Sequence, residues 1–242
     1  MRFIVCFIDD SDFEHELVRT EIAPNAPDFE FVQTYTFAEA LKALGARIPV
    51  LFLLDLWGQD PAVAKPSIIG REELESRIAQ FKALDHVYDD IDPCRTDQIN
   101  EYLKRLFTIV DGWRRLFEQV CDRAGQNRKY GLANLQDART YYPGVPAVFY
   151  TRKSLINDAV AMFKAGANGL LIKPTGPNDE QTRAMTRANA PALIKELSQI
   201  VDAHLSGFMA HTDHYRSAGP GSKTPPADLI TEWKTYRTGQ KT

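Results

Sequence analysis

Residues 3–10 of the chain have the sequence Phe-Ile-Val-Cys-Phe-Ile-Asp-Asp, six apolar residues followed at once by two carboxylates. A strand buried on both faces of a parallel sheet has this continuous apolar pattern, whereas a half-exposed strand alternates. Three further continuous runs lie at 50–54, 147–150 and 169–172. The more alternating run at 29–35 predicts a less buried strand near an edge of the sheet.

Helical patterns separate these runs. Ser11 with Glu14, and Thr36 with Glu39, match the capping box, which predicts helices near 12–22 and 37–46. Residues 192–205 predict an amphipathic helix, with Pro191 in its first turn. Strands that alternate with helices indicate an α/β fold built on a parallel sheet with right-handed crossovers.

The alternation of strands and helices stops between residues 59 and 129, where no convincing strand is found. Two long apolar stripes at helical spacing, near 71–88 and 96–124, predict a helical hairpin. The last segment, 207–242, contains Gly219-Pro220-Gly221-Ser222 and predicts a mostly irregular C-terminal tail with one short helix around 228–236.

Composition excludes several classes of protein. The 242 residues carry a formal charge of −3, and 25% of them are charged, which argues against a disordered chain and against a nucleic-acid partner. The three cysteines are far apart, which favours free thiols in a reducing, cytoplasmic setting. The first apolar run is too short for a signal peptide or a membrane span, so no membrane association is expected.

Polar side chains stand directly after the expected strands. Asp9 and Asp10 follow the first, Asp55 the third, Thr151 the fourth and Lys173 the fifth. Functional groups of an open parallel sheet collect at the carboxyl ends of its strands, so these five side chains should share one edge. Close carboxylates need a cation, and Mg²⁺, which prefers oxygen ligands, suits them.

The sequence resembles the receiver domain of two-component response regulators, which implies a doubly wound five-stranded sheet in the order 2-1-3-4-5. The resemblance covers residues 1–58 and 130–206 as one discontinuous receiver domain, with 59–129 as an inserted helical hairpin and 207–242 as the tail. The residues that carry it are Asp9-Asp10, Asp55, Thr151, the stretch Ala165–Pro174 that contains Lys173, and Gly131-Leu132 with Leu135 and Arg139.

The resemblance implies a role for each of these residues. Asp55 would accept a phosphoryl group from a histidine kinase or phosphotransfer protein, with Mg²⁺ held by Asp9, Asp10, Asp55 and the backbone carbonyl of Trp57. Thr151 and Lys173 would bind the phosphoryl oxygens. Trp57 and Lys153 occupy the positions that tune hydrolysis in the family. Leu170 replaces the family's usual aromatic switch residue, so aromatic switching is not expected.

Three functions stay open at this point. The first is a signalling receiver that acts by protein contact, without a DNA-binding output domain, and whose only chemistry is self-phosphorylation from a phosphodonor and autodephosphorylation. The second is a degenerate receiver that serves as a phosphorylation-independent binding scaffold. The third is a Mg²⁺-dependent phosphohydrolase. The hairpin could cover Asp55, admit only one partner, or join two chains in a homodimer.

Overall fold

The structure is a computed structural model of the chain, and it describes residues 2–60, 62–80, 87–89, 97–152, 156–210 and 226–239. The chain divides into two compact units. Met1–Gly58 and Arg128–Thr242 form the first, called the sheet unit below, and Gln59–Asn127 form the second, called the inserted unit.

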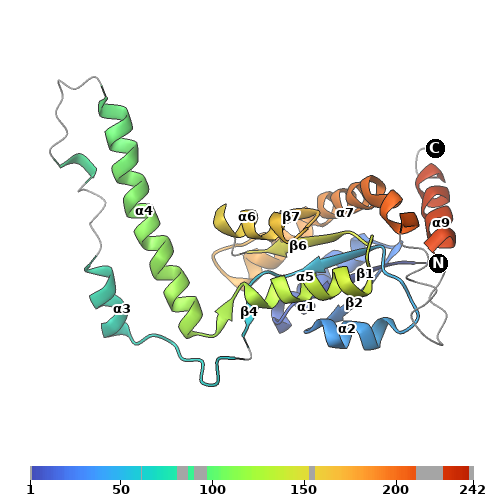
Figure 1. Cartoon of the computed structure of the whole chain (residues 1–242), viewed down its shortest axis with the longest axis horizontal. Coiled ribbons are helices and arrows are strands. Elements are labelled where there is room, and N and C mark those ends of the chain that lie inside the picture. Colours follow the sequence, from blue (N-terminus) through green and yellow to red (C-terminus); the bar gives the residue numbers. More distant parts are fainter. Residues whose placement is uncertain are drawn as a thin grey trace. The chain divides into compact units, whose positions relative to one another are not determined.

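Five parallel strands make up the central sheet of the sheet unit (Figure 1). Their order is β2-β1-β3-β6-β7, which confirms the doubly wound fold with order 2-1-3-4-5. Every residue of β1, β3 and β6 is buried and β2 is only partly buried, as the apolar patterns predict. The continuous run at 169–172 predicts a strand buried on both faces, which is wrong, because β7 lies at the edge of the sheet and Ile172 is 55% exposed. The strands are β1 (Phe3–Ile8), β2 (Phe29–Thr34), β3 (Leu51–Leu54), β6 (Ala147–Thr151) and β7 (Gly169–Ile172).

Helices cover both faces of this sheet (Figure 1). On one face α7 contacts the π-helical turn that continues α1, and α2 contacts α5 on the other. Among the described residues, no helix combines the length and apolar character that crossing a membrane requires. The helical segments are α1 (Asp12–Leu17), the π-helical turn Val18–Ile22, the 3-10 turn Ala23–Asn25, α2 (Phe37–Leu44), α5 (Lys129–Tyr141), α6 (Ile156–Lys164) and α7 (Asp179–Ala210).

The end of the chain differs from the expectation. Pro191 lies inside the 32-residue helix α7 and not in its first turn, because the polar residues before it are also helical. The helix continues through Ala210, past the start of the expected tail. Beyond it, Pro226–Gly239 form a helix, α9, that is longer than the expected short helix, while residues 211–225 and 240–242 lie outside the described residues.

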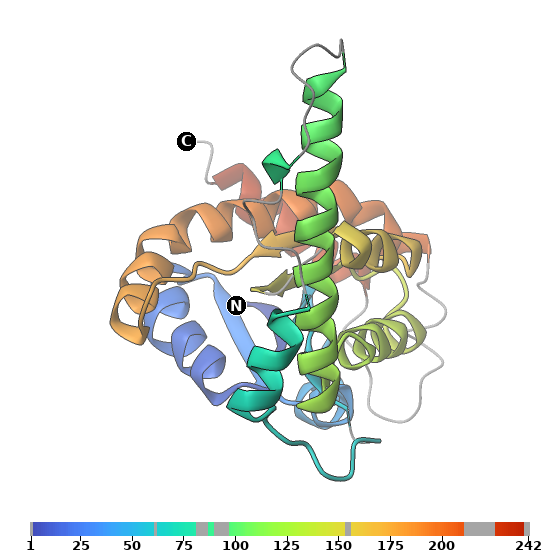
Figure 2. The ribbon, with the colours of Figure 1, turned by 90° about the vertical axis from the view of Figure 1, so that its left-hand side faces the viewer.

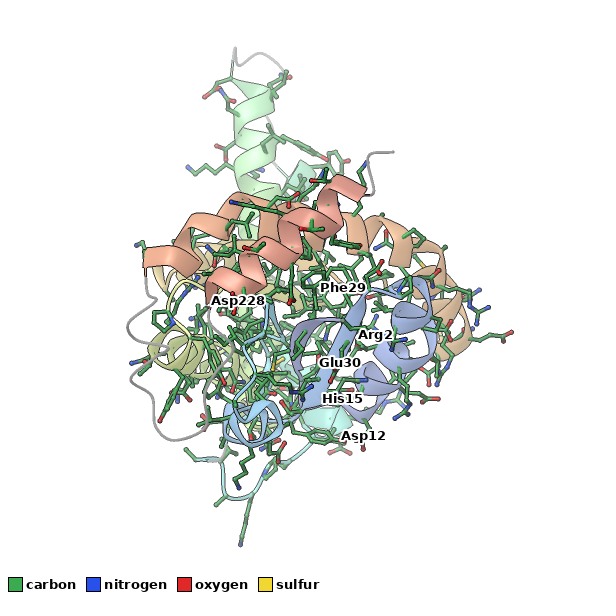
Figure 3. All side chains as sticks on the ribbon, turned by 90° about the vertical axis from the view of Figure 1, so that its right-hand side faces the viewer. Arg2, Asp12, His15, Phe29, Glu30 and Asp228 are labelled. Carbon is green, nitrogen blue, oxygen red and sulfur yellow. The ribbon has the colours of Figure 1, made fainter. Side chains whose placement is uncertain are left out.

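Helix α9 packs against the amino-terminal ends of β1 and β2 (Figure 3). Trp233 is 1% exposed, and its ring meets Phe3 edge-on at a centroid distance of 4.8 Å and Phe29 at 6.0 Å. Its indole N–H donates a hydrogen bond of 2.7 Å to Asp202 of α7, which also pairs with Arg237. The buried aromatic contact explains why this segment is helical and docked.

The inserted unit contains α3 (Arg71–Ile78) and α4 (Gln98–Arg123), which lie beside one another (Figure 2). Arg123 of α4 pairs with Glu73 of α3 at 2.6 Å, and Arg77 donates to Gln119 at 2.9 Å. Helix α3 ends at Ile78, ten residues before Tyr88, where the sequence predicts its end. Residues 81–86 of this interval lie outside the described part of the chain.

Contrary to expectation, two short strands, β4 (Gly58–Gln59) and β5 (Gln126–Asn127), pair where the chain leaves and re-enters the sheet unit. A two-residue strand is too short to produce an alternating pattern, so the sequence gives no sign of it.

We predict that Trp233→Ala lowers the free energy of unfolding by about 3–5 kcal/mol, because it removes a fully buried aromatic side chain. Trp233→Phe keeps a ring but loses the hydrogen bond to Asp202, and it should cost less. Urea denaturation measures both. Lys234→Ala, at an exposed position of the same helix, is the control. A Trp233→Ala variant as stable as this control would contradict the docking of α9.

Candidate phosphoacceptor and metal site

Three carboxylates meet at the carboxyl-terminal edge of the sheet. Asp9 and Asp10 follow β1 and Asp55 follows β3, and because these strands are parallel neighbours, their ends lie side by side. One oxygen from each carboxylate lies within 4.8 Å of the others. Asp9 and Asp55 are buried and Asp10 is half-buried, so the cluster lies largely out of solvent.

The ammonium group of Lys173 lies between two of these carboxylates. Its Nζ is 2.5 Å from Oδ2 of Asp9 and 3.0 Å from Oδ1 of Asp55. The side chain leaves the sheet just beyond β7 and is 4% exposed. It runs past the rings of Phe7 and Tyr150, whose centroids are 5.9 and 5.7 Å from Nζ. Lys173 therefore offsets the charge of two buried carboxylates at once.

Burial and mutual repulsion set the protonation of the cluster. Burial raises the pKa of Asp9 to about 7; Lys173 opposes this shift, and Asp55 and Glu14 add to it. Burial alone would lower the pKa of Lys173, but Asp55, Asp9 and Glu14 outweigh it and raise that pKa above its ordinary value. The lysine is thus held as a cation in the middle of an acidic group.

Thr151 and Trp57 stand at the same edge of the sheet. Thr151, 1% exposed, ends β6 and pairs with Ile172, the residue before Lys173. Trp57 lies two residues beyond Asp55 and is buried. Its expected partner in tuning hydrolysis, Lys153, lies outside the described residues. The structure therefore gathers Asp9, Asp10, Asp55, Trp57, Thr151 and Lys173 at one edge of the sheet.

A glycine allows α5 to approach the loop after β3 closely. The N–H of Gly131 donates to the carbonyl of Leu56 at 3.1 Å. A Cβ atom at Gly131 would come within 2.4 Å of the carbonyl oxygen of Asp55 and 2.6 Å of Cα of Leu56, both backbone atoms that cannot move aside alone. Close packing therefore requires glycine at this position. This is the physical reason for Gly131 among the residues that carry the sequence resemblance.

Two further charged residues lie at the site, Glu14 and Arg152, which no motif in the sequence marks as site residues. Glu14 is buried, and its carboxylate lies 2.6 Å from Arg152 and 3.6 Å from Lys173. Arg152, directly after Thr151, also donates to the carbonyl of Pro174 and, at 3.0 Å, to Thr175. It therefore ties α1 to the segment after β7. The capping-box pattern is correct for Ser11, whose hydroxyl accepts from the N–H of Glu14, but it hides the role of the Glu14 side chain.

Tyr130, at the start of α5, is a third residue near the site that no motif in the sequence marks. Its hydroxyl donates to the carbonyl of Tyr35 at 2.7 Å, and its ring would clash with any Cβ at Gly58. Burial raises its pKa, and the charges of Asp9, Asp10 and Asp55 raise it further, which places it in the field of the acidic cluster. No motif identifies a tyrosine at this position; only the packing of α5 does.

The acidic cluster suits a hard divalent cation. Carboxylate oxygens are the ligands that Mg²⁺ and Ca²⁺ prefer, and three of them lie close enough to share one ion. The half-buried Asp10 leaves the cluster in contact with solvent, which allows the ion to keep water ligands. The donor set thus fits a divalent metal on chemical grounds.

No protein-family model and no curated protein matches the chain. Solved structures similar to it include a CheY-like receiver domain protein from Methanospirillum hungatei, with a TM-score of 0.42 and 12% identity over 84% of this chain and 99% of that one. A response regulator from Thermotoga maritima has a TM-score of 0.42 and 11% identity, with the same coverage. The receiver domain of NtrX from Brucella abortus has a TM-score of 0.37 and 15% identity, over 78% of this chain and 98% of that one. The fold is consistent with a receiver domain, as its own strand order shows.

We predict that Lys173→Met destabilises the protein by about 3–5 kcal/mol at pH 8, because it leaves Asp9 and Asp55 buried without their cation. A carboxyl whose pKa is raised on folding favours the folded state at low pH and loses that advantage as the pH rises through about 7. The loss should therefore be smaller at pH 5, where Asp9 is protonated. Urea denaturation at both pH values measures it.

Lys164→Met, at an exposed position of α6, is the matched control and should cost little at either pH. An equal loss for Lys173→Met at pH 5 and pH 8 would show that repulsion between the carboxylates is not its cause.

Proposed function

We propose that the chain is a cytoplasmic signalling protein that accepts a phosphoryl group on Asp55 from a phosphohistidine of a histidine kinase or phosphotransfer protein. The observation that carries the proposal is the cluster itself: three carboxylates within 4.8 Å, with a buried lysine ammonium in contact with two of them, at the carboxyl edge of a doubly wound sheet. A cluster built only for stability would not need three buried or half-buried acids around one base.

The transfer forms one bond and breaks another. An Oδ oxygen of Asp55 attacks the phosphorus in line, the new C–O–P linkage forms, and the P–N bond to the donor imidazole breaks, with its electron pair returning to the ring nitrogen. Asp9, Asp10, Asp55 and the backbone carbonyl of Trp57 would hold Mg²⁺, which when bound offsets the charge of the phosphoryl oxygens. The carboxylate acts as the nucleophile, so no proton has to leave Asp55.

Lys173 and Thr151 would receive the new group. Phosphorylation adds roughly two negative charges to the acceptor side chain. Lys173 already touches Asp55 at 3.0 Å and needs only a short shift to contact a phosphoryl oxygen on it. Thr151, whose carbonyl accepts from the N–H of Lys173 at 3.1 Å, would donate its hydroxyl and draw the segment after β6 toward the site.

A phosphorylation-independent scaffold and a Mg²⁺-dependent phosphohydrolase are the alternatives. Against the hydrolase, Glu14, the remaining buried carboxylate near the cluster, is paired with Arg152 at 2.6 Å and lies 3.6 Å from Lys173, so it is poorly placed to activate a water as a general base. The scaffold differs from the receiver only in leaving Asp55 unmodified, and phosphodonor experiments separate them.

We expect wild-type protein with Mg²⁺ and acetyl phosphate or phosphoramidate to gain the mass of one phosphoryl group, and Asp55→Asn to gain none. Beryllofluoride with Mg²⁺ should change the fluorescence of Trp57, which is buried two residues from Asp55. Intact-protein mass spectrometry and fluorescence titration measure the two effects, and chelation of the metal should abolish both.

Asp137→Asn, at an exposed position of α5, is the matched control and should react like wild type. Failure to react with small donors and with phosphohistidine proteins alike would favour the scaffold. Continuous release of phosphate from a phosphoester would favour the hydrolase.

Trp57→Ala should shorten the lifetime of the phosphorylated form several-fold, because the buried indole beside Asp55 would shield the acyl phosphate from water. Loss of phosphoryl mass with time after donor removal measures the lifetime. Phe163→Ala, which removes an exposed aromatic ring from α6, is the control. An unchanged lifetime in a Trp57→Ala protein whose circular dichroism matches wild type would contradict the shielding role.

A further inference from the structure

Helix α4 of the inserted unit carries both buried and exposed apolar side chains. Ile109, Leu116 and Cys121 are buried. Exposed apolar residues follow one face along most of the helix: Ile99 (76% exposed), Leu103 (52%), Phe107 (68%), Val110 (56%), Trp113 (46%) and Phe117 (38%). Single exposed apolar residues are ordinary, but a continuous stripe of this size marks an interaction surface.

Within the inserted unit, α3 reaches only one end of α4. Arg77 and Glu73 of α3 contact Gln119 and Arg123 of α4, and α3 itself has no buried residue. In the described part of this unit, the stretch of α4 around Leu103, Phe107 and Val110 thus keeps more than half of each side chain exposed. A long helix gains most of its stability from packing of an apolar face, so this stretch calls for a partner.

The spacing of the stripe identifies the kind of partner. Leu103, Phe107, Val110, Trp113 and Phe117 are separated by four, three, three and four residues. Spacings of three and four are those of a helix seam that packs against another helix. The series is also the same in both directions from Val110, so an antiparallel pair of identical helices centred there places apolar side chains opposite apolar side chains.

We propose that α4 pairs with α4 of a second copy of this chain, antiparallel, with the two-fold axis at Val110. Leu103 then faces Phe117 of the second copy, and Phe107 faces Trp113. The small valine lies where the helices cross most closely, and the aromatic residues fill the space to either side. None of the residues of this interface belongs to the site around Asp55.

Charges beside the stripe favour the antiparallel direction. Lys104 and Glu118 lie fourteen residues apart, close to four helical turns, and therefore flank the stripe on the same side. In an antiparallel pair Lys104 lies within one turn of Glu118 of the second copy, which also pairs with Arg114 of its own helix at 2.8 Å. A parallel pair would instead put equivalent side chains on opposite sides of the stripe and would not bring Lys104 beside Glu118. Asp111, near the axis, is already neutralised by Arg114 and Arg115 at 2.8 Å each.

The surface is large enough for a specific but modest interface. Fully burying an aromatic side chain removes about 150–250 Å², so the exposed fractions correspond to on the order of 500 Å² per helix and about 1,000 Å² per pair. That total is near the lower limit for specific protein interfaces. We therefore expect a monomer–dimer equilibrium that depends on concentration.

Sedimentation equilibrium of the full chain tests the proposal. Wild type should dimerise, and Val110→Glu should raise the dissociation constant at least tenfold, because it puts two carboxylates on the axis. Thr108→Glu adds the same charge at an exposed position on the opposite, polar side of α4 and should leave the constant within about twofold. Circular dichroism checks that both variants keep wild-type helix content.

Disulfide formation tests the direction of pairing. Val110→Cys should cross-link to itself, and a mixture of Leu103→Cys and Phe117→Cys chains should cross-link to each other faster than either does alone. Peptide mapping by mass spectrometry identifies the linked residues, with wild type as control for Cys6, Cys94 and Cys121. A protein that is monomeric at all concentrations, a dimer insensitive to Val110→Glu, or preferential Leu103→Cys self-linkage would overturn the proposal.

Discussion

The ion pairs of Lys173 with Asp9 and Asp55 hold together the carboxyl-terminal edge of the sheet, where the candidate site lies. Asp9 and Asp55 come from neighbouring strands and would repel one another in a buried setting; the lysine at 2.5 and 3.0 Å allows both to stay there. Glu14 adds a third carboxylate at 3.6 Å, and Arg152 offsets it. Ion pairs thus link the carboxyl ends of β1, β3 and β7, in addition to the backbone hydrogen bonds of the sheet.

This arrangement follows from local features that a sequence displays. Strands β1 and β7 begin and end at the residues expected from their continuous apolar runs. Burial on both faces explains this pattern for β1 only, because β7 lies at the edge of the sheet and its last residue, Ile172, is exposed. Polar residues placed directly after such strands must lie at one edge when the strands are parallel. Asp9, Asp10, Asp55, Thr151 and Lys173 could therefore be grouped without any knowledge of their contacts.

Features that arise from contacts between distant segments could not be predicted in this way. Glu14 matches a capping box, yet its side chain turns toward Arg152, 138 residues further along the chain. Trp233 stands in a segment whose sequence predicts a mostly irregular tail, and only its contacts with Phe3 and Phe29 place it in the core. Pro191 is compatible with a helix start, and only the continuation of α7 on both sides of it decides otherwise. For Glu14 and Trp233 the missing information is a tertiary contact, and for Pro191 it is the conformation of the residues before it.

The inserted unit can vary without disturbing the site. Its two ends are joined by the β4–β5 pair, so closing this 69-residue excursion costs the sheet unit little entropy beyond what a short loop would. Gly131 holds the returning chain against Leu56, one residue from Asp55. A change at Asp55 therefore has a short covalent route toward α4 through residues 56–59 and 126–131. A larger side chain at Gly131 would disturb both the loop after β3 that contains Asp55 and this route. Substitutions on the exposed stripe of α4 would leave that loop intact.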